Sequence, residues 1–284
     1  MDTLVASEST FNTWPPELLY HYTNEAALAG ILESKVIRAS KVQSSSQREI
    51  IRALELASRN LAELKRYNPS RAAQDELEGL ALEMEGYESV NICAASFTEC
   101  GDSVSHFERY GRYAIGFRSE RLAWSNSSGF YFAQCVYDEK RQTELVRYAL
   151  RIGLRDLPAG VIVDDIWPPA SLGNLGNMIP PAFPDALVTL APLVKDPRDK
   201  RDAEWRLVSP YPRLLEDSAG SKPYVRLAIP DEGVARIIVG RGPEERHALD
   251  CATALARKHV IGLSVRLSNT SAIGASSTPG PEKS

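Results

Sequence analysis

The chain is poor in cysteine, carries little excess charge and has no long apolar run, and each of these absences excludes a class of protein. Its four cysteines are widely spaced and form no C-x-x-C pair, which argues against a structural zinc site. Scattered cysteines in a chain without an export signal are most simply buried free thiols, here Cys93, Cys100, Cys135 and Cys251. We therefore expect no metal site and no disulfide.

The charge balance argues against a general nucleic-acid binder. A net charge of −4 and a pI near 5.7 lack the basic excess that nonspecific phosphate binding needs, although 33 Lys and Arg residues leave room for a local basic patch. The apolar runs are too short to cross a bilayer, and the first residues, MDTLVASEST, do not resemble a signal peptide. We therefore expect a cytoplasmic protein that does not contact a membrane.

What is present is typical of a folded globular chain. Of the 284 residues, 43% are hydrophobic and 25% are charged, which is close to the average for soluble domains. At about 150 residues per domain, this length corresponds to one large domain or two small ones. The 18 glycines and 18 prolines show no period, which excludes a collagen-like chain.

The N-terminal part predicts an arm, a strand and a capped helix. The arm covers residues 1–17, and the β-prone run at 18–22 follows it. Thr23 or Asn24 can cap a helix over residues 25–33, because both side chains accept hydrogen bonds from the free amides of a first turn.

A helical hairpin is predicted after a short strand at 36–39. Ser46 and Glu49 form a capping-box pattern before apolar residues spaced by threes and fours. Asn68-Pro69 interrupts the pattern, and a second helix follows it. The two helices form an insertion over residues 46–86.

The remainder of the chain predicts mostly strands. They are expected at 90–97, 114–117, 130–137, 187–193, 204–208, 224–229, 235–239 and 260–267. Helices are expected at 106–110 and 243–259. Residues 153–185 contain six prolines and predict a long loop, and the tail over 268–284 is expected to be disordered.

Two segments carry residues suited to chemistry. His21 lies in a strand directly before a helix N-terminus, where free amides suit an anionic ligand; the alternative is an ordinary histidine on an edge strand. Asp202 and Glu204 are two residues apart at the start of a strand and are expected to face the same side. Such a pair can stabilise a cationic transition state, or it can be a solvated strand end.

Three further motifs are less specific. Ser96 ends a buried strand, where its hydroxyl either binds a ligand or caps a turn. The segment Gly240-Arg241-Gly242 lacks the third glycine and the acidic residue of a dinucleotide fingerprint, so we interpret it as a strand-to-helix turn. Nothing in the local sequence pairs Cys135 with His106 as a nucleophile and base.

The order of these motifs resembles an uncharacterised bacterial family, a domain of unknown function grouped with the ADP-ribosyltransferases. The motifs are Tyr20-His21-Tyr22-Thr23 with its helix, Ser96-Phe97-Thr98-Glu99, the segments 102–103, 107–110 and 114–117, the E-W-R segment Glu204-Trp205-Arg206, and the ending 236–240 with 260–267. The resemblance spans residues 18–267. Two features depart from it: a serine run at 42–47 replaces an Asn-Asp-Pro-type turn, and Phe107 replaces a common tryptophan.

The resemblance implies an α+β fold, an ADP-ribosyltransferase-like split β-sandwich with a helical insertion. It implies one domain over residues 18–267, which includes the insertion at 46–86 and the Pro-rich loop at 153–185. The arm at 1–17 and the tail at 268–284 would lie outside that domain.

The resemblance also implies an NAD-dependent mono-ADP-ribosyltransferase-like enzyme, with NAD as its substrate and a macromolecular acceptor, protein or nucleic acid. Glu204 would stabilise the oxocarbenium ion as the glycosidic bond breaks, and Asp202 would orient the acceptor. Tyr110 or Tyr22 would stack on the nicotinamide ring. The full set of residues implied to bind NAD is His21, Tyr22, Thr23, Ser96 and Tyr110.

Three alternatives stay open at this point. Water can be the acceptor, which would make the enzyme an NAD glycohydrolase. The fold can also be a non-catalytic module that binds a nucleotide or a protein, or a regulatory protein that acts through the insertion at 46–86. By analogy, bacterial transferases of this kind serve as toxins or in phage defence. The enzyme hypothesis predicts that Glu204→Ala removes activity and leaves the fold intact.

Overall fold

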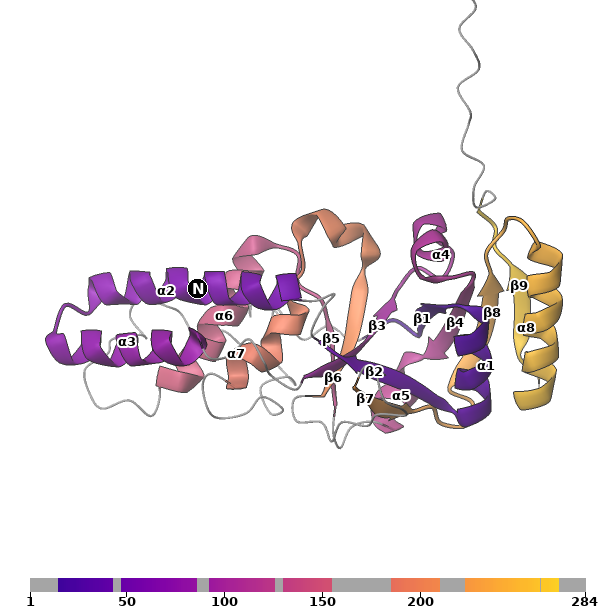
Figure 1. Ribbon diagram of the computed structural model, residues 1–284, viewed down its shortest axis with the longest axis horizontal. Helices are drawn as coiled ribbons and strands as arrows, with labels where there is room; N and C mark the ends of the chain where they lie inside the picture. The colour runs from indigo at the N-terminus through magenta and orange to yellow at the C-terminus, as the bar shows by residue number, and fades with distance from the viewer. Residues whose placement is uncertain are drawn as a thin grey trace, which may run out of the picture. The chain divides into compact units, whose positions relative to one another are not determined.

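The structure is a computed structural model that describes residues 15–42, 47–85, 92–125, 130–154, 185–209, 223–260 and 262–270. It has a mixed α/β architecture with a mostly antiparallel sheet, in agreement with the expected α+β class (Figure 1). The chain divides into two compact units. The first unit comprises residues 1–15, 38–96 and 126–227, and the second comprises residues 16–37, 97–125 and 228–284.

The second unit contains a four-stranded core of sheet in the order β1-β4-β8-β9. Its strands are β1 (Leu18–Thr23), β4 (Tyr113–Arg118), β8 (Val234–Val239) and β9 (Ser264–Leu267). Neighbouring strands are antiparallel except for β8 and β9, which are parallel and are joined by helix α8 (Glu245–His259). A helical crossover is the usual way to join parallel neighbours. The shorter helices are α1 (Glu25–Ser34), α4 (Val104–Tyr110) and α5 (Ser119–Ser125).

Helix α1 forms as the sequence predicts, with Asn24 as its cap. The Asn24 side chain accepts a hydrogen bond from the amide of Ala27 at 2.9 Å. The helix ends where Lys35 takes a left-handed conformation with φ of 54°. Leu28 and Leu32, one turn apart, are fully buried, so one face of the helix packs into the unit.

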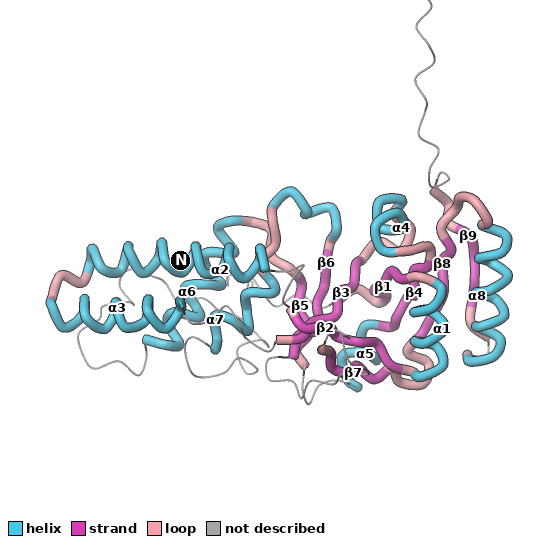
Figure 2. The backbone as a smooth tube through the Cα atoms, in the orientation of Figure 1, coloured by secondary structure: helices cyan, strands magenta, loops and turns pink. Residues whose placement is uncertain are grey.

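The first unit contains both strands and helices (Figure 2). Its strands are β2 (Val36–Lys41), β3 (Cys93–Thr98), β5 (Tyr131–Gln134), β6 (Glu204–Ser209) and β7 (Tyr224–Ala228). Strand order is β5-β6-β3, and β2 pairs with β3 and with β7. Its α-helices are α2 (Gln47–Tyr67), α3 (Arg71–Glu85), α6 (Glu139–Leu154) and α7 (Asp185–Leu190), and its 3₁₀ helices are η3 (Ala191–Leu193) and η4 (Pro197–Asp202).

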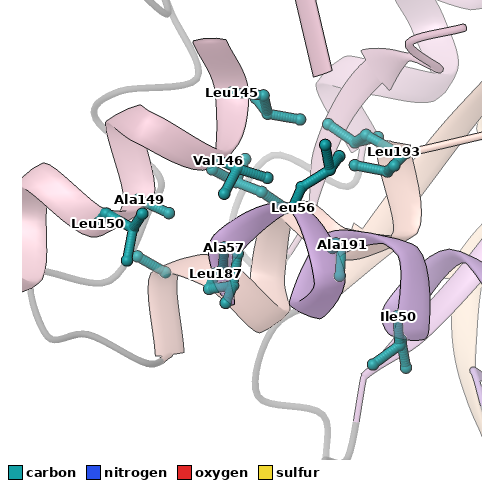
Figure 3. Close-up of a cluster of buried hydrophobic side chains, with 14 of the residues drawn as sticks. Ile50, Leu56, Ala57, Leu145, Val146, Ala149, Leu150, Leu187, Ala191 and Leu193 are labelled. Carbon is teal, nitrogen blue, oxygen red and sulfur yellow. The ribbon is translucent and has the colours of Figure 1, made fainter. Parts of the chain in front are cut away.

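A large apolar cluster holds the helices of the first unit together. Figure 3 shows side chains from α2, α6, α7 and η3 meeting in this cluster. Leu56, Leu145 and Leu187 are almost completely removed from solvent there. Each such side chain contributes about 1.5–3 kcal/mol relative to an exposed position. The predicted hairpin of α2 and α3 is therefore an integral part of this core, since α2 supplies one of its faces.

In the first unit one strand prediction is wrong and one helix was not predicted. The segment 187–193 forms the end of α7 and η3. A short apolar run fits a buried helix as well as a buried strand, and here the run faces helices α2 and α6. Residues 139–154 form α6, which was not predicted; Leu145 and Ala149 lie one turn apart on its buried face.

The predicted disordered tail begins too early, at residue 268, because residues 268–270 are ordered within the second unit. Ser268, Asn269 and Thr270 follow β9, and the Asp102 carboxylate accepts hydrogen bonds from the hydroxyl of Ser268 and the amide of Asn269. Most of the arm (1–14), of the Pro-rich loop (155–184) and of the tail (271–284) lies outside the described residues. No described helix has the length and the apolar composition that a membrane span requires.

All four cysteines are free thiols, but only two are buried. Cys93 and Cys135 lie inside the protein, Cys251 is partly exposed and Cys100 is exposed. The expectation of four buried thiols is therefore correct for half of them.

Candidate functional site

Glu204 is the first residue of β6, and its backbone is held in place by hydrogen bonds to both its amide and its carbonyl. Its amide donates to the hydroxyl of Tyr137 at 3.0 Å, and its carbonyl accepts from the amide of Cys135 at 2.9 Å. The residue is only 8% exposed. A carboxylate this deep in a protein needs charged or hydrogen-bonding partners to remain ionised.

Three side chains of the first unit supply these partners. The Arg206 Nε donates to Glu204 Oε1 at 2.7 Å, and Lys195 Nζ lies 3.0 Å from Oε2. Ser96 adds a hydrogen bond from its hydroxyl to the same carboxylate. Arg206 can reach Glu204 because residues two apart on a strand face the same side. Ser96 is exposed to solvent, so the buried carboxylate contacts a residue at the protein surface.

A second buried carboxylate completes the cluster. Glu49, in the first turn of α2, places its Oε1 3.1 Å from Lys195 Nζ and 3.1 Å from Arg206 Nη2. Glu49, Lys195, Glu204 and Arg206 form what we call the charge cluster, with two charges of each sign. Arg206 also donates from Nη1 to the carbonyl of Pro192, which anchors the guanidinium beside η3.

The backbone positions Lys195 for this role. The amide of Lys195 donates to the carbonyl of Val136 at 3.0 Å, and the side-chain amide of Gln142 donates to the carbonyls of both residues. Gln142 lies on α6, so this helix holds the segment between η3 and η4 in place. The ammonium group thereby reaches both carboxylates of the charge cluster at about 3 Å.

Three members of the charge cluster, Glu204, Lys195 and Arg206, are held ionised at neutral pH. Burial by itself raises the pKa of Glu204, but the charges of Arg206 and Lys195 outweigh it and lower this pKa to about 2. For Lys195, burial lowers the pKa and the two carboxylates raise it, with a net rise to about 12. The pKa of Arg206 is raised, because the attraction of Glu204 outweighs the effect of burial. Burial also raises the pKa of the neighbouring Cys135 thiol, which therefore stays protonated.

Asp202 does not share a strand face with Glu204, which corrects the prediction of a carboxylate pair. Asp202 is the last residue of η4, and Ala203 has a left-handed backbone with φ of 42°. The alternation of a strand begins only at Glu204, so the two-residue spacing does not align the side chains. Asp202 is partly exposed, whereas Glu204 is buried.

The histidine of β1 is on an internal strand of the second unit. His21 pairs with Ile115 of β4, and on the other side of β1 Tyr20 pairs with Thr98, which also belongs to the second unit, so the alternative of an edge strand is wrong. The imidazole is partly exposed and packs 5.8 Å from the Phe97 ring. Thr23 is buried, and Asn24 already accepts one amide of the following helix.

Tyr22 and Tyr110, the two candidates for stacking on a ligand ring, differ in exposure. The hydroxyl of Tyr22 donates to the carbonyl of Cys100 at 2.9 Å and accepts from the amide of Ser103 at 3.0 Å. Burial, as the largest effect, raises its pKa. Tyr22 therefore anchors the 100–103 loop, whereas the Tyr110 ring is 47% exposed and faces the Arg109 guanidinium at 5.1 Å. Of the two rings, Tyr110 offers a surface for stacking.

The glycine-containing turn has the role that the sequence predicts. Gly240-Arg241-Gly242 links β8 to α8, and Gly242 has φ of 144°, a conformation that favours glycine. The Arg241 Nε donates to the carbonyl of Ser268 at 2.8 Å. The Arg241 side chain thus holds the segment that follows β9 in place.

The predicted site residues fall into two groups. The first unit contains Ser96, Asp202 and Glu204, and the side chains of Ser96 and Glu204 are hydrogen-bonded there. The second unit contains the other predicted site residues, which are His21, Tyr22, Thr23 and Tyr110. Sequence reasoning missed Lys195 and Glu49. The sequence pattern places Glu49 in a capping box and does not single out Lys195, because no local pattern links positions that meet only in the fold.

Comparisons with protein-family models, with curated proteins and with solved structures found no match for this chain.

Proposed function

We propose that the protein is an NAD-dependent ADP-ribosyltransferase-like enzyme in which Glu204 is the catalytic carboxylate. One observation carries the proposal: Glu204 is held ionised and oriented, with its pKa lowered to about 2, and it hydrogen-bonds to the exposed Ser96. Positive charge develops on the ribose as its bond to nicotinamide breaks. A carboxylate fixed in advance beside that ribose lowers the barrier without having to reorganise.

The remaining assignments follow from the sequence resemblance and from the exposure of each side chain. Tyr110 is the candidate for stacking on the nicotinamide, because its ring is half exposed and Tyr22 is engaged by the 100–103 loop. His21 and Thr23 are proposed to bind the ribose or phosphates, and Asp202 to orient a protein or nucleic-acid acceptor. The proposal includes the split β-sandwich of that fold, with which the mostly antiparallel sheet is compatible.

A specific observation also favours a second candidate, a non-catalytic module that binds a nucleotide or a protein. Both oxygens of Glu204 already have cationic partners, and the charge cluster is neutral as a whole. A neutral cluster attracts a developing cation less than a lone carboxylate does. This candidate predicts that NAD stays intact in the presence of the protein.

The experiment uses NAD labelled on its adenylate phosphate, incubated with purified protein and a cell lysate. Wild type is compared with Glu204→Gln and with Glu63→Gln, a control that removes a carboxylate paired with Arg147 at a more exposed position of α2. Glu204→Gln is preferred to Glu204→Ala. Both substitutions remove the charge from a buried ion pair, at a cost of about 3–5 kcal/mol, but Gln keeps most of the side-chain volume, whereas Ala also leaves a cavity. Far-UV circular dichroism establishes that each variant is folded.

The enzyme proposal predicts that wild type and Glu63→Gln consume NAD, and that Glu204→Gln is slower by a factor of about 10²–10³. Label in macromolecules identifies a transferase, and digestion with protease or nuclease then identifies the acceptor class. An unchanged rate in a folded Glu204→Gln variant would show that Glu204 is not catalytic. Intact NAD in every sample would favour the binding module.

A further inference from the structure

One oxygen of the charge cluster has no partner. Glu49 Oε1 contacts Lys195 and Arg206, whereas Oε2 is buried and has no hydrogen-bond partner within the described part of the chain. The Glu49 side chain is only 9% exposed. A buried carboxylate oxygen that lacks a donor loses its hydration without compensation, so this position calls for a bound hydrogen-bond donor.

A water molecule is the donor that best fits an enclosed polar position. Buried polar groups that lack a protein partner are commonly satisfied by ordered water. Glu49 offers an ionic acceptor, because two cations hold its other oxygen in the charge cluster. A water on Oε2 would therefore be both oriented and polarised by a carboxylate.

This position lies beside the proposed catalytic carboxylate. The same Lys195 Nζ is 3.1 Å from Glu49 and 3.0 Å from Glu204, and Arg206 also contacts both. All four residues belong to the first unit. Enzymes that hydrolyse glycosidic bonds use two such neighbouring carboxylates, and in the inverting class one of them takes a proton from the attacking water.

We propose that Glu49 is the general base for water, so that the enzyme hydrolyses NAD; this inference rests on the proposed function of Glu204. The bond between C1′ of the ribose and the nicotinamide nitrogen breaks, and its electron pair neutralises the pyridinium. The water oxygen bonds to C1′, and its proton moves to Glu49 Oε2. The products are nicotinamide, ADP-ribose and one proton, which Glu49 releases to solvent.

The inference also gives the helical insertion a catalytic role. Glu49 is in the first turn of α2, and the buried face of α2 packs against α6, α7 and η3. The insertion thus positions a carboxylate in the charge cluster. A purely regulatory insertion would not need a buried carboxyl group that contacts Lys195 and Arg206.

Azide separates the role of a base from that of a structural residue. We would measure nicotinamide release from NAD by wild type, Glu49→Gln, Glu204→Gln and the control Glu63→Gln, each with and without sodium azide. Azide is already an anion, so it attacks C1′ without a base. We expect Glu49→Gln to lose at least about 10²-fold in the rate with water and to recover with azide, forming ADP-ribosyl azide. Glu204→Gln should stay slow with either nucleophile.

The outcomes distinguish the two proposals. No nicotinamide release by wild type, either in buffer or with the cell lysate added, overturns the proposed function and this inference with it. Release that occurs only with the lysate overturns this inference alone. Activity in wild type with an undiminished water rate in Glu49→Gln, or with a loss that azide does not restore, overturns the role of Glu49 alone. If melting shows that Glu49→Gln is unfolded, Glu49→Asp takes its place: it retains the charge but shortens the side chain, and the water rate should fall while the azide rate does not.

Discussion

The charge cluster makes a quantitative prediction about how Glu204 and Arg206 depend on each other. Glu204→Gln leaves Arg206 and Lys195 with Glu49 alone, which gives the buried site a net positive charge. Arg206→Gln leaves two carboxylates with Lys195 alone, which gives a net negative charge. The double variant keeps Lys195 and Glu49 as one balanced pair at 3.1 Å.

The expected magnitudes follow from this charge balance. Each single substitution breaks a buried ion pair and should lower the free energy of unfolding by about 3–5 kcal/mol. The double variant should cost no more than either single one, because no charge is left unbalanced. The coupling free energy in the double-mutant cycle should therefore be about 3 kcal/mol or more.

The assay is urea denaturation at pH 7, followed by tryptophan fluorescence, to which the buried Trp205 contributes. The control is the same cycle on Glu63 and Arg147, a more exposed pair at 2.9 Å, whose coupling should be below about 1 kcal/mol. If the substitutions at Glu204 and Arg206 are additive to within about 0.5 kcal/mol, the four side chains do not act as one cluster, and the reasoning is refuted.

Three further predictions concern pH and the second unit. Folding lowers the pKa of Glu204 to about 2, so the ionised carboxylate stabilises the folded protein fully above pH 4.5, and this stabilisation is lost as the pH falls toward 2. In an acid titration, Glu204→Gln should therefore lose less unfolding free energy than wild type. Tyr22→Phe removes the hydroxyl that accepts from the Ser103 amide and should lower the unfolding free energy by about 1–3 kcal/mol in urea. Asp102→Ala removes the acceptor of Ser268 and should speed proteolysis after β9 without changing the circular dichroism.

Much of the fold could be predicted from local patterns, because local forces determine those elements. Asn24 caps α1 through an interaction three residues away, and Asn68-Pro69 lies where α2 ends. The apolar spacing of α2 and α3 predicts the helical hairpin directly. These signals depend on neighbouring residues alone, so tertiary structure does not override them.

The missed elements depended on tertiary context. The run 187–193 has the composition of a strand but forms helix where it faces α2 and α6. The alignment of Asp202 with Glu204 required both to be in one strand, and the left-handed Ala203 separates them. In both cases a correct prediction would have required the packing partners or the backbone conformation of the segment, which the residue pattern does not contain.

The candidate site was predictable only in part. Ser96 and Glu204 were singled out from the sequence, with roles implied by the resemblance, and the structure brings their side chains together. Glu49 and Lys195 lie 155 and 9 positions before Glu204, on separate elements, and no spacing rule joins them. A buried charge cluster of this kind is a product of the packed fold, in which each cation compensates the desolvation of two carboxylates.

The most direct test of the proposed role of Glu204 is the release of nicotinamide from NAD by wild type and by folded Glu204→Gln, each purified and assayed with a cell lysate that supplies acceptors. The account predicts measurable release by wild type and a rate lower by about 10²–10³-fold in the variant. Equal rates in the two proteins, or intact NAD with wild type, would contradict it.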